Sequence, residues 1–481
     1  GWLYGCHGVF THSNIGKPGA TNDERVPLNA GVWRYHPTKD KFEVFAYGTS
    51  NPWGVDFNAQ GDFFISACVI PHFYNMIQGG RYIRQGRASH FNPYIFESID
   101  TIADHAHYTG AIQDHAFWNE NKTLRPPAPA DTSALGGGHA HCGLALYLAD
   151  TFPEEFQGDA FFHNLHGHRM IREALNHDGS GYVAQHKPGF MFANDHDFIG
   201  VGVMLGPDGA IYYSDWHDAQ TCHHRDVEIW DRSNGRIFRV RYGDKQPFKF
   251  DLQKESDEQL VEKIAHPNSF FARRAQRILQ ERAHNGTLNL GTAKLGLEAL
   301  ASDEEPAEIR LRAIWTQWVC GLLDEADLLT QLQDKDTYVR AWALQFLGED
   351  KDALSPTALS VVESMAKEED SAVILRYLAS LMQRLPLDQR WGIADAILKQ
   401  PDGFSNDRNI PYLTWYGMEP LVGEDPVRAM AMAENTKWNK LKNFIFRRAS
   451  VKEAGRDLLV STLRNAPNAQ SYETRANQLL L

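Results

Sequence analysis

The chain has 481 residues, of which 43% are hydrophobic and 23% charged, a composition typical of a globular protein with roughly two to four domains. Its formal net charge of -13 leaves no basic surplus to neutralise phosphates, so we expect no nucleic-acid partner. The sequence contains no apolar run of about 18 residues, and we therefore expect no transmembrane segment.

Glycine and histidine divide the chain into two parts. Of the 38 glycines, 28 lie before residue 245, and so do 19 of the 21 histidines. The two parts differ in periodicity as well as in composition, which predicts an N-terminal domain over residues 1–244 and a second domain over 251–481.

Five scattered cysteines give no disulfide framework, because their number is odd and their density is low. No C-x-x-C-H motif occurs, so we expect no covalently bound haem in this chain. The opening residues Gly1–Gly5 read as the middle of a strand, and we therefore expect the natural protein to begin upstream of Gly1.

Residues 1–244 alternate apolar and polar positions between Gly, Asn, Asp and Pro turns, the pattern of short β-strands. Gly31–Tyr35 and Lys41–Phe45 predict one hairpin, and Gly158–Phe162 with Arg169–Ile171 predicts another.

Two further segments, Asn58–Ser66 and Gly206–Asp215, each place a Gly-containing turn before an aromatic strand, and Gly235–Val240 predicts an outer strand. Such recurring units predict the blades of a β-propeller whose first blades are missing. Residues 71–138 form a long insertion between them.

Residues 251–481 follow a 3.6-residue period and predict helices. Asp336–Leu344 has the D-x-x-V-R-x-x-A-L pattern of HEAT repeats. Related stretches begin at Phe271, Ile309 and Val373, and, with Val339 as the equivalent position, the separations are 38, 30 and 34 residues. The fold class expected is thus all-β plus all-α: an incomplete β-propeller followed by a HEAT-like α-solenoid.

Paired histidines are the first candidates for chemistry. His139 and His141 follow three glycines, and residues two apart on a strand point to one face, so the pair can direct two imidazoles at one ion or substrate. The alternative is that these are hydrogen-bonded structural histidines.

Carboxylates beside imidazoles are the second candidates. Asp195, His196 and Asp197 form one such cluster, and Asp215 with His217 forms another. Either cluster suits a general base with an orienting acid or a site for a hard metal, but strand-end turns also produce this pattern. The run Cys222–His224 suits a soft metal or a plain loop.

The turn Asn51–Trp53 combines an amide, a proline and an aromatic ring. It can present Asn51 and Trp53 to a planar or sugar-like ligand. In the alternative interpretation it is an ordinary turn with Trp53 packed in the core.

Long motifs in this chain resemble the membrane-bound dehydrogenase family of planctomycetes and verrucomicrobia. The resemblance rests on residues 1–19, Asn51–Phe57, Gly136–His141 and Glu228–Arg239, and with the helical repeats it covers essentially the whole chain. The propeller of that family is in turn similar to the soluble quinoprotein glucose and sorbosone dehydrogenases.

The resemblance implies pyrroloquinoline quinone (PQQ) with calcium as cofactors and an extracytoplasmic location. It implies oxidation of a sugar or a sugar-derived alcohol or aldehyde on the propeller face, with a cytochrome as electron acceptor. We expect His139 and His141 to act in catalysis, His7, Asn51, Trp53, Arg169 and His196 to contact the quinone, and Asp195, Asp197 and Asp215 to bind the metal. In the quinoproteins the catalytic histidine lies just before the strand equivalent to Gly1–Gly5, so the resemblance implies that its counterpart lies upstream of Gly1. Ser50 stands where the quinoproteins have an arginine, so one cationic contact to the quinone is missing.

Two other functions fit the same residues. One is a non-catalytic scaffold that binds a glycan or a protein, with the solenoid as a docking face for a protein partner. The other is a metal-dependent, lactonase-like propeller that uses the His and Asp clusters.

Overall fold

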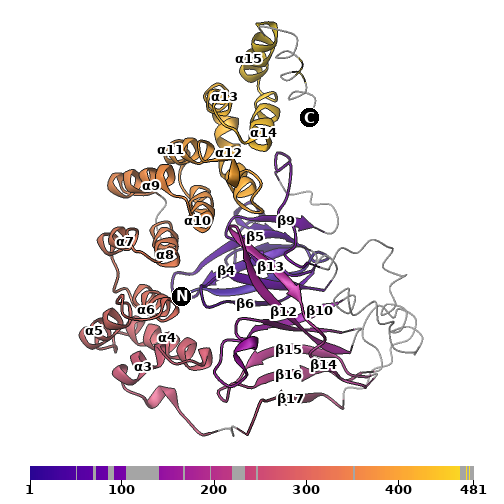
Figure 1. Cartoon of the computed structure of the whole chain (residues 1–481), viewed down its shortest axis with the longest axis vertical. Helices are drawn as coiled ribbons and strands as arrows, with labels where there is room; N and C mark the ends of the chain where they lie inside the picture. Colours follow the sequence, from indigo (N-terminus) through magenta and orange to yellow (C-terminus); the bar gives the residue numbers. More distant parts are fainter. Residues whose placement is uncertain are drawn as a thin grey trace.

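The computed structural model describes residues 1–49, 51–68, 72–84, 92–104, 140–165, 168–195, 197–218, 233–244, 248–349, 353–465, 473 and 476. Within these ranges, β-sheets fill the first 244 residues and 13 α-helices follow (Figure 1). None of the helices in these ranges is long and apolar enough to cross a membrane.

The strands form four main sheets and one small ribbon, and all neighbours are antiparallel except β5 and β9. The first sheet contains β1 (Leu3–His7), β4 (Gly31–His36), β5 (Lys41–Thr49) and β9 (Arg81–Arg84), and the second contains β6 (Pro52–Phe57), β7 (Phe63–Ala67) and β8 (Tyr74–Met76). The third contains β10 (His141–Leu146), β11 (Ala160–Asn164), β12 (Arg169–Asp178), β13 (Gly181–His186) and β14 (Met191–Phe192). The fourth contains β15 (Gly200–Leu205), β16 (Ile211–Asp215) and β17 (Arg236–Val240), and the ribbon contains β2 (Ser13–Ile15) and β3 (Val26–Leu28).

The hairpins and strands predicted from the alternating pattern are confirmed. β4 pairs with β5, and β11 pairs with β12. The two turn-plus-strand segments give β7 and β16, and β17 pairs with β16 at the edge of the fourth sheet. The turn before β7 needs glycine: Gly61 has a φ of 82°, and a side chain there would collide with the indole of Trp342.

The first strands of the second, third and fourth sheets lie side by side. Ser66 Oγ donates a hydrogen bond of 2.9 Å to the carbonyl oxygen of Gly143, and the thiol of Cys142 donates to the carbonyl oxygen of Gly200 over 3.2 Å. Gly54 permits this approach, because a Cβ there would lie 2.5 Å from the carbonyl carbon of Gly143. The described strands do not close into a barrel.

The helices stack in two rows, since each even-numbered helix from α4 to α14 contacts the next even-numbered one. The row of α4, α6, α8 and α10 faces the sheets, and the array continues past their edge (Figure 1). The bounds are α3 (Asp257–Ile264), α4 (Ser269–His284), α5 (Leu290–Leu300), α6 (Ala307–Val319), α7 (Glu325–Gln331), α8 (Thr337–Leu347), α9 (Pro356–Glu368), α10 (Ala372–Met382), α11 (Leu387–Leu398), α12 (Ile410–Glu424), α13 (Pro426–Glu434), α14 (Asn439–Ala449) and α15 (Glu453–Arg464).

The repeat pattern marks the starts of the helices that face the sheets. Phe271, Ile309, Val339 and Val373 all lie in the first turn of α4, α6, α8 and α10 respectively. In α8, Asp336 is the N-cap, and its carboxylate accepts hydrogen bonds from the backbone N–H groups of residues 338 and 339. The aspartate of the repeat pattern therefore starts the helix, and the valine enters the core.

A buried ion pair joins the helices to the sheets. Arg376 of α10 donates a hydrogen bond of 2.7 Å to Asp62, in the turn between β6 and β7, and the two side chains are 1% and 5% exposed. The hydroxyl of Tyr182, from β13, donates to the same carboxylate over 2.6 Å, and the hydroxyl of Tyr338, from α8, lies 3.2 Å from that of Tyr182. Burial raises the pKa of both tyrosines, so both hydroxyls stay protonated and act as donors.

A second buried pair lies further along the same junction. Arg34 of β4 donates hydrogen bonds to Glu43 of β5 and to Glu349, just after α8, the latter over 2.6 Å. One hydrophobic cluster contains apolar residues from both the sheets and the helices, among them Phe45 and Leu344. The two parts of the chain thus share a core, and the division at residues 244 and 251 stays a prediction about domains.

We predict that Asp62→Ala lowers the free energy of unfolding by about 3–5 kcal/mol, because it leaves the guanidinium of Arg376 buried without its counter-charge. Urea unfolding measures this change. The double variant Asp62→Leu/Arg376→Met should regain much of the loss, since it removes both charges.

The matched control is Asp395→Ala, which breaks an ion pair with Lys399 on the surface of α11. This exposed pair should contribute little. Equal losses from the two aspartate variants would contradict the importance assigned to the buried pair.

Candidate functional site

Most of the side chains predicted to act in catalysis or binding lie at one end of the sheets. β6, β10 and β15 begin at this end, and β7, β11 and β16 finish there. A chain of backbone hydrogen bonds crosses it: Cys68 donates to Asn51, Ala140 to Cys68, and Leu165 to Ala140, over 2.8, 2.6 and 3.0 Å. We call this surface the strand-end face.

The first corner of the strand-end face contains His7, Asn51 and Trp53. His7 ends β1, and its Nε2 lies 2.8 Å from Ser13 Oγ. A side chain at Gly8 would collide with Asn51 Oδ1, so the amide of Asn51 lies against the end of β1. Trp53 is 46% exposed, which places its ring on the surface and not in the core. This corner can present an amide and an indole to a ligand.

The second group centres on His141, whose side chain is fully buried. Its ring stacks on that of His72 with centroids 3.7 Å apart and an interplanar angle of 13°. Nε2 of His72 lies 3.4 Å from Glu173 Oε1, and both side chains have zero exposure. Phe162 closes one side with edge contacts to both imidazoles. A carboxylate and two imidazoles in such a setting can hold or transfer a proton, but His141 does not face solvent.

His139, the other half of the predicted catalytic pair, lies outside the described residues, and so do His196 and the run Cys222–His224. His72 and Glu173 were not predicted from the sequence. They are 101 residues apart, and neither belongs to a motif with a recognisable spacing.

The third group contains two of the predicted metal ligands joined by an arginine. Nη2 of Arg236 lies 3.0 Å from Asp195 Oδ2 and 2.5 Å from Asp215 Oδ2. The other oxygen of Asp215 accepts backbone N–H groups from Ile199 and His217 over 2.8 and 2.9 Å. The guanidinium therefore occupies the position between two carboxylates where a cation would be expected to bind.

One arginine offsets part of the charge of the two carboxylates in this third group. Burial raises the pKa of Asp195, but the hydrogen bonds from Arg236 and from the backbone N–H of Asp197, together with nearby positive charge, outweigh burial and hold that pKa below its usual value. Asp197 contributes its backbone, which donates to Asp195 Oδ1 over 3.1 Å. Across the described ranges, no group of three His, Cys, Asp or Glu side chains is arranged to hold a metal ion.

Arg169, predicted to bind the quinone, begins β12 at this same end. It is 7% exposed, and its guanidinium carbon lies 4.9 Å from the centre of the Phe192 ring. The face thus combines imidazoles, an amide, an exposed indole and a largely buried arginine. The predicted residues that the structure describes share one end of the sheets and divide into separate groups on it.

A cavity bordered by described residues lies elsewhere. It measures about 600 Å³ and is bounded by Phe57, the last residue of β6, whereas Asn51 directly precedes β6 at the strand-end face. None of the described residues predicted from the sequence to act in catalysis or binding lines it.

We predict that His163 makes the protein less stable in mild acid. Burial lowers the pKa of His163, in β11, to about 4. The unfolded chain takes up this proton near pH 6.5 and the folded chain only near pH 4, so stability is highest above pH 6.5 and falls as the pH drops between these values. The loss attributable to His163 should be about 2 kcal/mol between pH 7 and pH 5.

Urea unfolding of wild type and of His163→Gln at these two pH values measures the effect, with exposed His12→Gln as control. His163→Gln should weaken the pH dependence and His12→Gln should not. An unchanged pH dependence in His163→Gln would contradict the assignment.

Comparisons with known proteins identify a family and little more. No curated protein matches the sequence. A crystal structure from Thermus thermophilus, described as a "putative oxidoreductase (glucose dehydrogenase)", aligns at 17% identity and a TM-score of 0.26 over 41% of this chain. The aligned part spans 47% of the Thermus chain. An engineered protein solved by the Northeast Structural Genomics Consortium aligns at 14% identity and a TM-score of 0.19, over 47% of this chain and 94% of its own.

These TM-scores are too low to assign a fold. The family match is stronger, because it covers residues 1–244, which is more than half of the 481 residues. The chain therefore belongs to the family described as a domain of unknown function, DUF7133.

Proposed function

We propose that the four sheets are blades of an incomplete β-propeller, and that the strand-end face oxidises a sugar or a sugar-derived alcohol or aldehyde. One observation carries the proposal: His7, Asn51, His141, Arg169 and Asp215 come from distant parts of the sequence and lie at one end of the sheets. Ligand sites built from strand ends are common in β-proteins, where loops from successive sheets meet.

PQQ is the proposed cofactor, and it would supply the hydride-accepting chemistry when bound. Three described side chains suit a planar molecule that carries carboxylates: the amide of Asn51, the exposed ring of Trp53 and the guanidinium of Arg169. His7 and His196 complete the set proposed from the resemblance. His139 and His141 remain the proposed catalytic pair. Because His141 is buried and stacks on His72, which lies beside Glu173, its role would be to hold or relay a proton and not to take one from the substrate directly.

Calcium fits this face less well. The carboxylates of Asp195 and Asp215 already neutralise Arg236, so calcium at Asp195, Asp197 and Asp215 requires that guanidinium to move away. A metal-dependent lactonase would meet the same obstacle.

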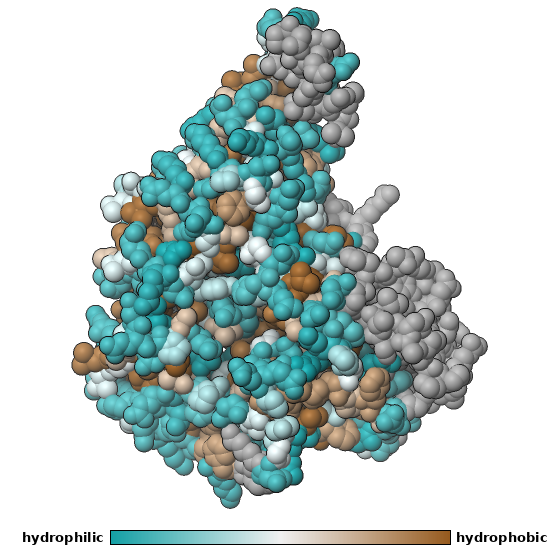
Figure 2. Space-filling view, in the orientation of Figure 1, coloured by the Kyte–Doolittle hydropathy of each residue, from teal (hydrophilic) through white to brown (hydrophobic). Residues whose placement is uncertain are grey.

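The remaining parts of the proposal rest on the resemblance to the membrane-bound dehydrogenases. They are a cytochrome as electron acceptor, an extracytoplasmic location and HEAT-type repeats that dock a protein partner. The molecular face shown in Figure 2 is mainly hydrophilic, with apolar residues scattered over it.

A second candidate is a scaffold that binds a glycan without turnover. The ion pairs of Arg236 favour it, because they leave the predicted metal position filled by a side chain. Quinone-dependent turnover separates the two candidates.

We predict that the purified protein, incubated with PQQ and calcium, reduces an artificial dye in the presence of an aldose or a sugar alcohol. Asn51→Ala and Trp53→Ala should each lower this activity at least about tenfold, because they remove an amide and a ring contact to the quinone. Asp395→Ala, on the outer row of helices, should leave it unchanged. Absence of both quinone binding and dye reduction would favour the glycan-binding scaffold.

We also predict that Arg236→Met lowers the melting temperature and that millimolar calcium chloride restores part of the loss, since the change leaves two carboxylates without their cation. Thermal unfolding measured with and without calcium tests this. Wild type should respond little. Stabilisation of wild type by calcium to the same extent would show that Arg236 does not block the position.

A further inference from the structure

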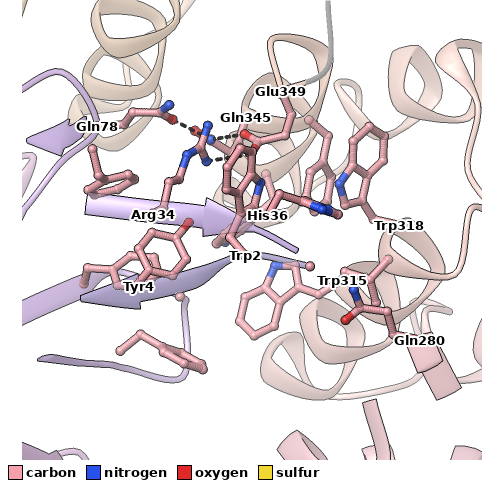
Figure 3. A pocket seen from close by; sticks show the side chains of 18 of the residues that line it. Trp2, Tyr4, Arg34, His36, Gln78, Gln280, Trp315, Trp318, Gln345 and Glu349 are labelled. Carbon is pink, nitrogen blue, oxygen red and sulfur yellow. Dashed lines mark hydrogen bonds and ion pairs between the residues drawn. The ribbon is translucent and has the colours of Figure 1, made fainter. Parts of the chain in front are cut away.

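We propose that the cavity between the sheets and the helices is a binding site for a neutral saccharide. The cavity of about 600 Å³ is within the range of about 300–1,000 Å³ typical of small-molecule sites. Residues of β1, β4 and β8 line it on one side, and residues of α4, α6, α8 and α10 line it on the other (Figure 3). We call it the tryptophan cavity, after Trp2, Trp315, Trp318 and Trp342 in its wall.

The helical wall of the cavity is a continuous aromatic surface. Trp315 and Trp342 meet edge to face at 5.1 Å between ring centroids, and Trp342 lies 5.3 Å from Phe346. Trp318 stacks on Phe346 at 4.5 Å and 15°. The C–H faces of a pyranose ring are flat and apolar, so such a wall suits a sugar ring that must keep its hydroxyls directed elsewhere.

The sheet side adds one more indole beside fixed polar groups. Trp2 lies under the guanidinium of Arg34, with 4.0 Å between the guanidinium carbon and the ring centroid, and meets His36 edge to face at 5.1 Å. Trp2 and the helical tryptophans therefore belong to opposite parts of the chain, and a ligand between them would contact both (Figure 3).

Amide side chains supply the hydrogen-bonding groups that sugar hydroxyls need. Gln78, Gln276, Gln280 and Gln345 all line the cavity. Gln345 Nε2 already donates to Gln78 Oε1 and to Glu349 Oε2, each over 2.8 Å, which fixes the orientation of all three groups. An amide both donates and accepts, as a hydroxyl does, and fixed amides distinguish a polyhydroxylated ligand from a purely apolar one.

The buried charges that line the cavity are balanced, which argues for a neutral ligand. Arg34 is paired with Glu43 and Glu349, and Arg376 is paired with Asp62. Burial raises the pKa of Tyr4, another lining residue, to about 12, so its hydroxyl is uncharged at neutral pH. The cavity therefore offers neither a cluster of cations for an anionic ligand nor a free carboxylate pair for a cation.

Aromatic rings, oriented amides and balanced buried charge together describe a site for a mono- to trisaccharide.

The test is direct binding by calorimetry and intrinsic tryptophan fluorescence. The probes are the neutral sugars glucose, cellobiose, maltose, xylobiose and lactose, with trigalacturonic acid as an anionic comparison. We expect at least one neutral sugar to bind and to quench the fluorescence. Trp318→Ala should weaken this binding about tenfold or more, because it removes a ring from the wall.

Gln280→Ala is the second variant, since Gln280 is half-buried at the cavity and its loss should weaken binding severalfold without disturbing the helix. Trp391→Phe is the matched control, because Trp391 lies in α11 and does not line the cavity. It should bind as wild type does. Urea midpoints of all variants show which of them are folded.

Three results would overturn the proposal: no neutral sugar binds, Trp318→Ala and Gln280→Ala both bind like wild type, or trigalacturonic acid binds more tightly than any neutral sugar. The strand-end face is at the other end of β6, so Asn51→Ala should leave sugar binding in the cavity unchanged. Failure of the dehydrogenase proposal is therefore distinguishable from failure of this one.

Discussion

The ion pair between Asp62 and Arg376 is the contact that fixes the helices on the sheets. Both side chains are almost completely buried, and an isolated charge in such a place would be strongly unfavourable. The hydroxyls of Tyr182 and Tyr338 complete the group, so two sheets and two helices converge on one carboxylate. A shift of α10 against the sheets would separate these charges, and the helical array is therefore docked in one register.

This constraint also explains why a cavity persists at the junction. The Asp62–Arg376 and Arg34–Glu349 pairs both border it. Each pair is satisfied only at the present separation of sheet and helix, so apolar contacts cannot draw the two surfaces together and fill the space. The bulky indoles of Trp315 and Trp342 hold the walls apart as well, and Gly61 makes room for them, because any side chain there would meet both rings.

Patterns among neighbouring residues were enough to predict strands and helices. The sites were predicted less completely, because they bring together residues that are far apart in the sequence. The hairpin Gly31–Phe45 and the helix starts at Phe271 and Val339 depend on neighbours a few residues away, where turn residues, alternation and N-caps act. The stack of His72 on His141 and its link to Glu173 depend on contacts between separate sheets.

The predicted metal cluster shows the same limit. Asp195 and Asp215 were identified because they stand beside histidines, and the structure does place both against one cation. That cation is the guanidinium of Arg236, 41 residues after Asp195, and no local motif connects the two. The tryptophan cavity was missed for a similar reason, since Trp2 and Trp342 become neighbours of one space only after the helices dock.

The location of the cavity has a thermodynamic consequence. A ligand that contacts Trp2 on one side and Trp318 on the other binds only when the helices are docked on the sheets. It therefore stabilises docking by the difference between its binding free energies for the docked and the undocked arrangement. The relation is reciprocal, because whatever strengthens the docking of α10 on the sheets also strengthens binding in the cavity. Removing the Asp62–Arg376 pair should therefore weaken ligand binding, even though the two side chains pair with each other and not with the ligand.

The helices beyond α10 have contacts of their own with the first sheet. In one of them, Tyr416 Oη donates a hydrogen bond of 3.2 Å to the carbonyl oxygen of Arg81. These contacts can keep the end of the helical array attached to the sheets when the docking of α10 strengthens or weakens. Ligand binding is therefore coupled to the docking of helices on sheets at the junction, and not at the surface of either part.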